Sequence, residues 1–187
     1  MAAEINAQGD FSIVRLDGIG PVRVGMNLSE LNKALHTSFK KPTDPDEQAC
    51  TYVEAPHQSG IGVMILDGRV ARVDVGNTST RTAEGIRNGD SEARVLQTYG
   101  KRLKIEPNYY DPENGHYLTL RSPDRKYGIR FESDDGKITS FYAGTTNAIA
   151  FVEGCSELYA PSQRHSDQEQ RYKGVCECQL WGVRTEY

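Results

Sequence analysis

The stretch Val22–Leu31, VRVGMNLSEL, decides the fold, because a later stretch, Ile86–Val95, IRNGDSEARV, follows the same pattern. In each of them an aliphatic residue and an arginine precede a glycine, and a helix-capping residue comes after it. An internal repeat of this kind indicates that one supersecondary unit occurs twice. We therefore predict two similar units within the 187 residues of the chain.

Both stretches carry the signals that begin a helix. Asn27 is a preferred N-cap residue, and Glu30, three positions later, completes a capping box. In the second copy Ser91 holds the cap position, and Arg94 stands where the first copy has its glutamate. Apolar residues at helical spacing follow each cap. A short amphipathic helix is therefore predicted in each copy.

Glycines mark the structural turning points of both copies. Gly25 and Gly89 precede the predicted helices, where each either takes up a backbone conformation that a Cβ disfavours or lets a neighbouring segment approach closely. Gly68 and Gly136 each follow an aspartate, and an Asp-Gly pair between strand-like runs is the strongest short signal for a hairpin. We expect a tight turn at each pair.

Strand patterns follow each predicted helix. In the first unit Val73 and Val75 alternate with Arg72 and Asp74, which indicates a strand with one buried face and one face in water. A similar alternation occurs in residues 127–131. The predicted fold class is α+β: two tandem copies of a short helix and a three-stranded antiparallel meander form one continuous sheet, with both helices on one face.

These patterns divide the chain into four parts. Residues 1–17 form an N-terminal extension, 18–76 the first repeat unit, and 77–153 the second unit, which shares one domain with the first. Residues 154–187 form a C-terminal tail of a different, more polar character.

The cysteines bear on the compartment in which the protein works. None of the four has the paired spacing of a zinc site, and an even number is typical of oxidising compartments. Three pairings are open, and we favour Cys50 with Cys155, because that bond would join the first half of the chain to the end of the second. Four reduced thiols in a cytosolic protein are the alternative. The state of Cys176 and Cys178 is left open, since a bridge across one residue would be strained.

Composition and motifs exclude several classes of protein. Lys+Arg number 22 and Asp+Glu 26, so the formal net charge of −4 argues against nucleic acid as a partner. No apolar run is long enough to span a membrane. The signatures of nucleotide-binding loops, zinc proteases and α/β-hydrolases are absent. We therefore predict no cofactor, no bound metal and no enzymatic activity.

Three short stretches of the sequence carry a resemblance to a known family. Residues 24–30, with the Cys50–Tyr52 stretch and the first Asp-Gly hairpin, resemble the helix-plus-meander module of the β-lactamase inhibitor proteins and of small outer-membrane assembly lipoproteins. Residues 18–155 also resemble exported bacterial proteins that carry two cysteines at these places. The resemblance implies a periplasmic or secreted, non-catalytic protein (an inhibitor, an immunity-type or an envelope-assembly protein) that binds another protein with an exposed sheet face. The beginning of the chain, Met1 before two alanines, lacks an apolar signal segment and fits a mature N-terminus behind a new start codon.

The candidate partner-binding residues are aromatic or basic and belong to the second unit. Tyrosine is favoured at protein interfaces for its large rigid area and polar tip. The alternative is that these tyrosines complete the core and that the arginines belong to a solvated hairpin. The candidates are Tyr109, Tyr110, Tyr117, Tyr142, Arg121, Arg125 and Arg130.

A rival hypothesis makes the chain a small-ligand-binding protein or a hydrolase. Its pocket would lie near His116 and the basic hairpin at residues 121–130, with Asp111 or Glu113 as the carboxylate for acid–base chemistry. A deep concave site that holds His116 within hydrogen-bond reach of a carboxylate would favour this rival.

Overall fold

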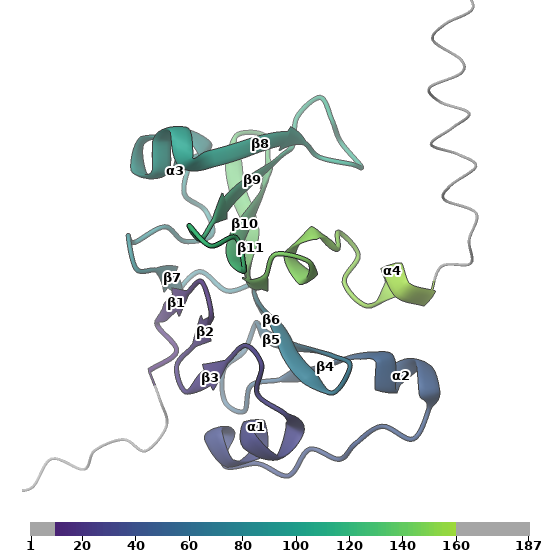
Figure 1. Ribbon diagram of the computed structural model, residues 1–187. Coiled ribbons are helices and arrows are strands. Elements are labelled where there is room, and N and C mark those ends of the chain that lie inside the picture. The colour runs from purple at the N-terminus through teal and green to yellow at the C-terminus, as the bar shows by residue number, and fades with distance from the viewer. Residues whose placement is uncertain (1–9, 160–187) are drawn as a thin grey trace, which may run out of the picture.

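The computed structural model describes residues 10–159, which form a mixed α+β fold made mostly of strands (Figure 1). A seven-stranded sheet has the strand order β4-β5-β6-β11-β10-β9-β8, and a four-stranded sheet has the order β3-β2-β1-β7. The predicted α+β class is found. The predicted single continuous sheet is not confirmed, because the strands form two sheets.

The seven-stranded sheet combines strands from both predicted units. All of its neighbouring strands are antiparallel, and β6 pairs with β11 where the two sets of strands meet. Its strands are β4 (Cys50–Glu54), β5 (Ile61–Leu66), β6 (Arg69–Val75), β8 (Leu103–Pro107), β9 (His116–Arg121), β10 (Tyr127–Asp134) and β11 (Lys137–Thr145).

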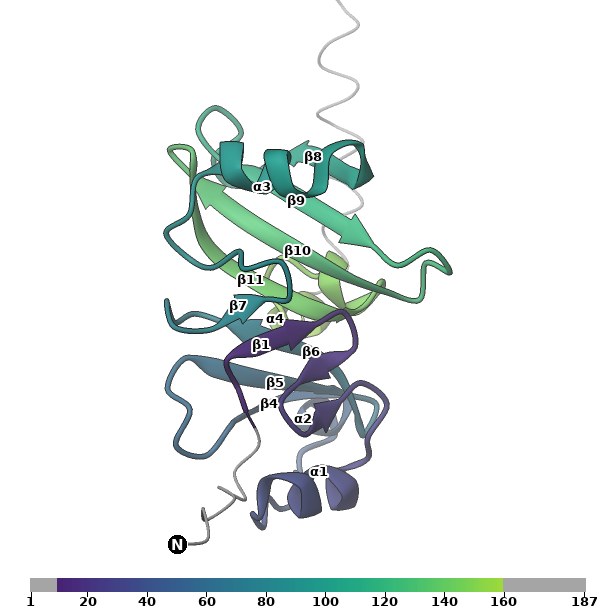
Figure 2. The same ribbon diagram turned by 90° about the vertical axis from the view of Figure 1, so that its left-hand side faces the viewer.

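The four-stranded sheet and two helices cover one face of the larger sheet (Figure 2). Residues that we assigned to the N-terminal extension contribute β1, which pairs with β2 in antiparallel and with β7 in parallel orientation. The strands are β1 (Ile13–Arg15), β2 (Gly18–Ile19), β3 (Val22–Arg23) and β7 (Arg81–Thr82), and the helices are α1 (Leu28–Leu35) and α3 (Glu92–Tyr99). The shorter helical elements are α2 (Pro45–Ala49), η1 (Gly100–Arg102), η2 (Ala148–Ala150) and α4 (Ser156–Tyr159).

The covered face of the large sheet carries the main core. Phe131 on β10 and Phe141 on β11 are cross-strand neighbours with ring centroids 5.6 Å apart. Leu31 from α1 and Val95 from α3 belong to the same buried cluster. Each helix therefore contributes its apolar face to a shared core, as an amphipathic helix requires. A second apolar row of neighbours across β5, β6, β11 and β10 consists of Val63, Val73, Ala143 and Ile129.

Both predicted helices and their caps are found. The Asn27 side chain accepts a hydrogen bond from the Glu30 backbone N–H at 3.0 Å, and the Glu30 carboxylate accepts one from the Asn27 backbone at 2.8 Å. In the second helix the Ser91 Oγ accepts from the Arg94 backbone at 3.3 Å. The capping residues read from the sequence therefore begin both helices.

Two roles were predicted for Gly25 and Gly89, an unusual backbone conformation or the close approach of a neighbouring segment, and the structure distinguishes them. Gly25 has φ +92° and Gly89 has φ +89°, and a Cβ added at either would meet nothing within 4 Å. The requirement is therefore conformational, not a close approach. Gly68 and Gly136 also have positive φ, as does the aspartate before each, which is the geometry of a two-residue hairpin turn.

We predict that alanine at Gly25 or at Gly89 lowers the free energy of unfolding by about 1–2 kcal/mol, because an L side chain is strained at positive φ. Gly62 is the matched control: its φ is ordinary and its Cβ would lie 3.6 Å from Tyr52. Urea unfolding of the three single variants measures the effect. Equal costs at all three positions would contradict this explanation.

Within residues 10–159, no helix combines the length and the apolar character needed to cross a bilayer. The questions raised by Cys176 and Cys178, and by the tail beyond residue 159, lie outside the described residues.

Candidate functional site

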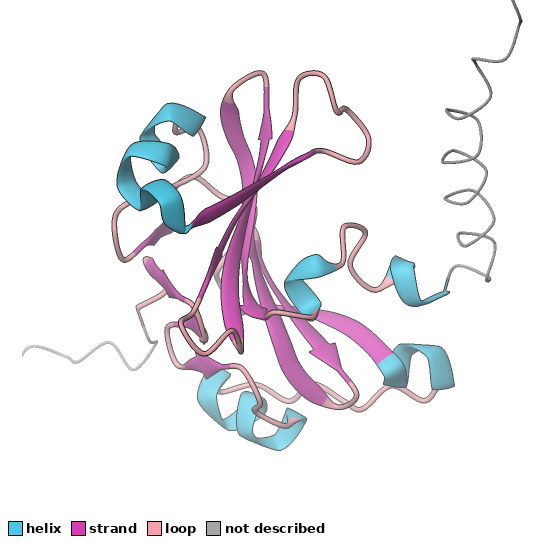
Figure 3. Ribbon diagram, turned by 45° about the horizontal axis from the view of Figure 1, so that its top comes forward, coloured by secondary structure: helices cyan, strands magenta, loops and turns pink. Residues whose placement is uncertain are grey.

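The second face of the large sheet, which we call the polar face, carries a row of polar side chains beside a small buried cluster that includes Met64 and Ala148. Asp74, Tyr142, Arg130 and Thr119 are successive cross-strand neighbours on β6, β11, β10 and β9. The segment of residues 146–159, which contains η2 and α4, lies on this side of the sheet, away from α1 and α3 (Figures 1 and 3). We call these residues the C-terminal strap. Their contacts decide how much of the polar face is open.

The C-terminal strap is fastened to the sheet at both ends. Gly128 leaves room for η2, since a Cβ there would lie 2.6 Å from the Ile149 side chain. The favoured pairing of Cys50 with Cys155 is present and joins the far end of the strap to β4, with a sequence separation of 105. The polar face is therefore partly covered, and this cover is covalently attached.

Arg72 is the central charged group under the strap. Its guanidinium forms a salt bridge with Asp74, with Nη2 2.8 Å from Oδ1, and donates from the same nitrogen to the Tyr52 hydroxyl at 2.7 Å. It also lies 4.1 Å from the centroid of the Tyr142 ring. Burial raises the pKa of Asp74 above its ordinary value, although Arg72 lowers it. Burial likewise raises the pKa of the Tyr52 and Tyr142 hydroxyls, so both stay neutral at physiological pH.

The expectation that Arg72 faces water is wrong. The residue is only 4% exposed, because its Nη1 donates to the backbone carbonyls of Ala148 at 3.1 Å and Phe151 at 2.7 Å in the strap. Its alternation with Val73 correctly places it on the other face of β6, but the strap then buries that position. Arg72 thus connects the sheet to its cover.

Arg130 makes a second set of contacts on the same face. Its Nε donates to the Thr119 hydroxyl at 3.0 Å, and its guanidinium lies 5.2 Å from the centroid of the Tyr117 ring. Nearby, the Tyr142 hydroxyl donates to Glu132 at 2.9 Å. Three of the predicted partner-binding residues, Arg130, Tyr117 and Tyr142, are therefore brought together, but all three are buried. A partner would reach them only after displacing their neighbours.

The other four predicted residues are exposed and lie at opposite ends of β9. Tyr109 and Tyr110 are 65% and 62% exposed in the loop before β9, where their rings pack edge to face with centroids 5.1 Å apart. Arg121 and Arg125 are exposed at the turn after β9. The seven candidates therefore do not form one surface.

His116 has a carboxylate partner, but not one that the sequence suggested. Its Nδ1 lies 2.9 Å from Glu92 Oε1 of α3, whereas Asp111 accepts hydrogen bonds from Asn114. The Ser133 hydroxyl donates to the same Glu92 carboxylate and not to the imidazole. In a serine–histidine–acid triad the imidazole lies between the serine and the carboxylate, so these three groups are not arranged as a catalytic triad. In residues 10–159 no three metal-ligating side chains gather.

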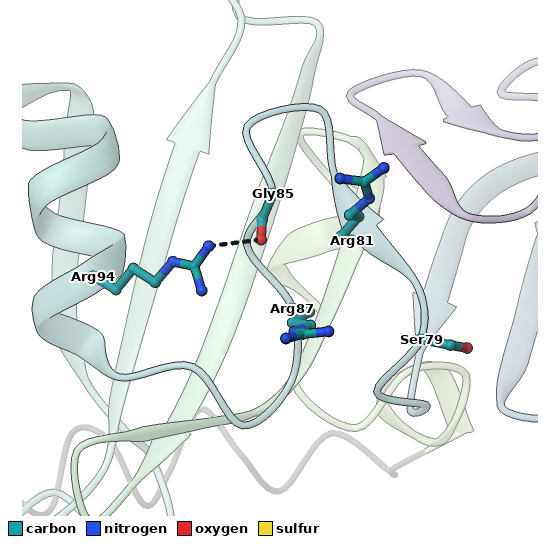
Figure 4. Close-up of a pocket in the computed structure, with 5 residues that line it drawn as sticks. All are labelled: Ser79, Arg81, Gly85, Arg87 and Arg94. Carbon is teal, nitrogen blue, oxygen red and sulfur yellow. Dashed lines mark hydrogen bonds between the residues drawn. The ribbon is translucent and has the colours of Figure 1, made fainter.

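Among residues 10–159, two hollows stand out, and neither is lined by His116. One, of about 110 Å³, lies near Phe11, Leu35 and His57, and is smaller than the ~300 Å³ at which ligand pockets begin. The other measures about 320 Å³ and reaches that size. It is lined by Ser79, Arg81, Gly85, Arg87 and Arg94 (Figure 4).

The arginines of the second hollow were missed in the sequence because they come from three separate segments. The one signal was Arg94, which stands where the first copy has a glutamate. That difference removes the capping-box partner and adds a positive charge to the same turn of the helix.

Comparisons with protein-family models and with curated proteins find no match to this chain. Function is therefore argued from the geometry of the described residues.

Proposed function

We propose that the chain is a non-catalytic protein-binding module of the bacterial envelope or exterior, and that its contact surface centres on Tyr109 and Tyr110. The observation that carries the proposal is the pair of adjacent tyrosine rings exposed in the loop before β9. Large aromatic side chains supply much of the binding energy at protein interfaces. The partner that fits is a folded protein with an apolar hollow that receives the two rings.

The tyrosine pair is held in place by its own loop. The Tyr109 backbone N–H donates to the Tyr117 hydroxyl at 3.3 Å, and the Tyr110 N–H donates to Asn108 Oδ1 at 2.9 Å. The Tyr110 hydroxyl donates to Glu153 of the C-terminal strap. A loop that is ordered before binding loses less conformational entropy when the partner arrives. The two tyrosines therefore form a contact surface whose loop is preorganised for binding.

The edge strand next to this loop extends the surface. β8 leads directly into the loop and, within residues 10–159, pairs on one side only. Ile105 on β8 is 50% exposed, and Lys104 and Glu106 form a salt bridge with nitrogen and oxygen 2.7 Å apart. A strand edge that carries charges resists unspecific pairing. This edge therefore suits a specific partner that also contacts the tyrosines.

The proposed compartment and architecture follow from other features. The Cys50–Cys155 disulfide supports an oxidising compartment such as the periplasm.

We further propose that the large sheet unites two copies of one unit. The side-chain caps of both helices and the similar φ angles of Gly25 and Gly89 support this. The family resemblance then suggests an inhibitor, an immunity-type or an envelope-assembly role.

Photo-crosslinking tests the proposal. A photoreactive residue replaces Tyr109 in the oxidised chain, which is mixed with bacterial envelope extract, and the matched control carries the same residue at Arg125. We expect one crosslinked protein at position 109, reduced by excess unlabelled parent chain and absent at position 125.

The identified protein is then purified and its affinity is measured. Tyr109→Ser with Tyr110→Ser should weaken binding by at least about 30-fold, because truncation of even one hot-spot residue costs about 2 kcal/mol or more. The control variant Arg125→Gln should change the affinity for the same protein by less than about twofold. An affinity that is the same for the parent and the tyrosine double variant would overturn the proposed surface.

A further inference from the structure

Three arginines from three segments surround the larger hollow. Arg81 belongs to β7, Arg87 to the loop between β7 and α3, and Arg94 to α3 itself. Figure 4 shows Arg94 reaching from the helix towards Gly85, with Arg81 and Arg87 on the facing segments. The hollow therefore has positive charge on several sides.

Part of this charge has no direct partner. Neither the Arg81 nor the Arg87 side chain forms a hydrogen bond or salt bridge within the described part of the chain. Arg94 is paired, with Nη1 2.8 Å from Asp90 Oδ1, and its Nη2 donates to the Gly85 carbonyl at 3.3 Å. The charge of Arg81 also acts on Asp10. The pKa of Asp10 is lowered mainly by hydrogen bonds from Ser12, and Arg81 lowers it further. The cluster keeps a net positive charge.

The backbone places two of these charges directly opposite each other. Arg81 and Arg87 are partners in an antiparallel β-bridge. Like charges at directly opposed positions destabilise a strand pair. Departures from locally favourable choices tend to occur at functional sites, where a ligand compensates for them. An anion between the two guanidinium groups would relieve this repulsion.

The frame around the hollow is ordered. Asp90 Oδ2 accepts from the Arg87 backbone N–H at 2.9 Å, so the same carboxylate positions the Arg87 segment and the Arg94 guanidinium. The loop is closed by backbone hydrogen bonds from Gly85 to Thr82 at 2.9 Å and from Thr82 to Ile86 at 2.8 Å. The backbone that carries the three arginines, and the Arg94 guanidinium itself, are therefore ordered before a ligand binds.

We propose that this hollow binds a small organic phosphate or sulfate ester. Guanidinium groups bind tetrahedral oxyanions through paired, charge-assisted hydrogen bonds, which an ammonium does not reproduce. The volume of about 320 Å³ exceeds the ~30 Å³ of a water molecule many times over, so the space holds an organic group besides the anion. The Ser79 hydroxyl on its wall already donates to Asn77 Oδ1 at 3.2 Å, so the arginines are the donors that would hold the anion. This site is separate from Tyr109 and Tyr110 and goes beyond the protein-binding proposal.

Titration followed by two-dimensional NMR tests the site. Glucose 6-phosphate, inorganic phosphate, sulfate and glucose are each added at constant ionic strength up to about 10 mM. We expect saturable shifts of amide signals in residues 79–94 with the ester, weaker shifts with inorganic phosphate and sulfate, and none with glucose. Arg81→Gln and Arg87→Gln should each weaken binding of the ester about tenfold, and together about 100-fold. The matched control, Arg125→Gln, should bind like the parent.

Three results would overturn the proposal. They are an absence of saturable shifts in residues 79–94 with any probe, an unchanged affinity in the double variant, and inorganic phosphate binding as tightly as the ester. Arg81→Lys and Arg87→Lys keep the charge but lose the paired hydrogen bonds, so each should still weaken binding, and they serve if the double variant fails to fold. Tyr109→Ser with Tyr110→Ser should leave ester binding intact.

Discussion

Removal of the Cys50–Cys155 bond will lower the free energy of unfolding by about 4–5 kcal/mol, because the bond closes a long loop. Its sequence separation of 105 places it near the upper end of the range expected from the entropy of the unfolded chain. For a chain of this size the loss corresponds to a fall in Tm of about 10–20 °C. The bond also holds the C-terminal strap on β4, so its loss acts on the cover of the polar face.

Chemical reduction of the disulfide and replacement of both cysteines should lower the free energy of unfolding by similar amounts. Urea unfolding of the parent is compared with and without reductant, and Cys50→Ala with Cys155→Ala is measured in the same way. The reduced parent should unfold at a lower urea concentration than the oxidised parent, whereas the double variant should not respond to reductant. The denatured, unreduced parent should show no more than two of its four thiols free. A parent whose unfolding midpoint ignores reductant would contradict the prediction.

Local signals in the sequence predicted the local structure well. The caps at Asn27 and Ser91 begin helices, and the Asp-Gly pairs at Gly68 and Gly136 form tight turns, because these features depend on residues a few positions apart. The second sheet was missed for a related reason. Strands such as β2 and β7 have only two residues each, too few to show any alternation of polar and apolar positions.

The candidate site depended on long-range contacts that no local pattern contains. The sequence pattern places Arg72 in water. In the structure a carbonyl of η2, more than 70 positions away, accepts a hydrogen bond from it. His116 lies beside two carboxylates in the sequence but contacts a third, Glu92, on α3. Tyr109 and Tyr110 show the opposite case. The sequence left open whether they bind a partner or complete the core, and the structure leaves both rings exposed.

The pair of buried Arg72 and half-buried Asp74 yields the second large prediction. Arg72→Met keeps a side chain of similar length but removes the charge, and we expect it to lower the free energy of unfolding at pH 7 by about 3–5 kcal/mol. The loss arises because Asp74 keeps its charge without the guanidinium, and because the carbonyls of Ala148 and Phe151 lose their donor. The matched control is Arg121→Met at an exposed position, which should change stability by less than about 0.5 kcal/mol.

The pH dependence distinguishes a lost charge pair from a simple packing defect. A carboxyl whose pKa is raised in the folded state contributes stability that is present below its ordinary pKa of 3.8 and is lost as the pH rises through the raised value. In the parent, Arg72 limits this rise for Asp74, so removing the guanidinium raises the pKa further. Arg72→Met should therefore cost less at pH 4 than at pH 7, measured as the difference from the parent, so that the other carboxyls cancel.

A double variant completes the test of the Arg72–Asp74 pair. Arg72→Met with Asp74→Asn removes the buried negative charge, so it should be more stable at pH 7 than Arg72→Met alone and should lose the extra dependence on pH. Urea midpoints of the parent, the single variant and the double variant at both pH values provide the comparison. If the Arg72→Met cost is the same at pH 4 and pH 7, the destabilisation comes from packing, and Asp74 does not depend on Arg72 for its charge.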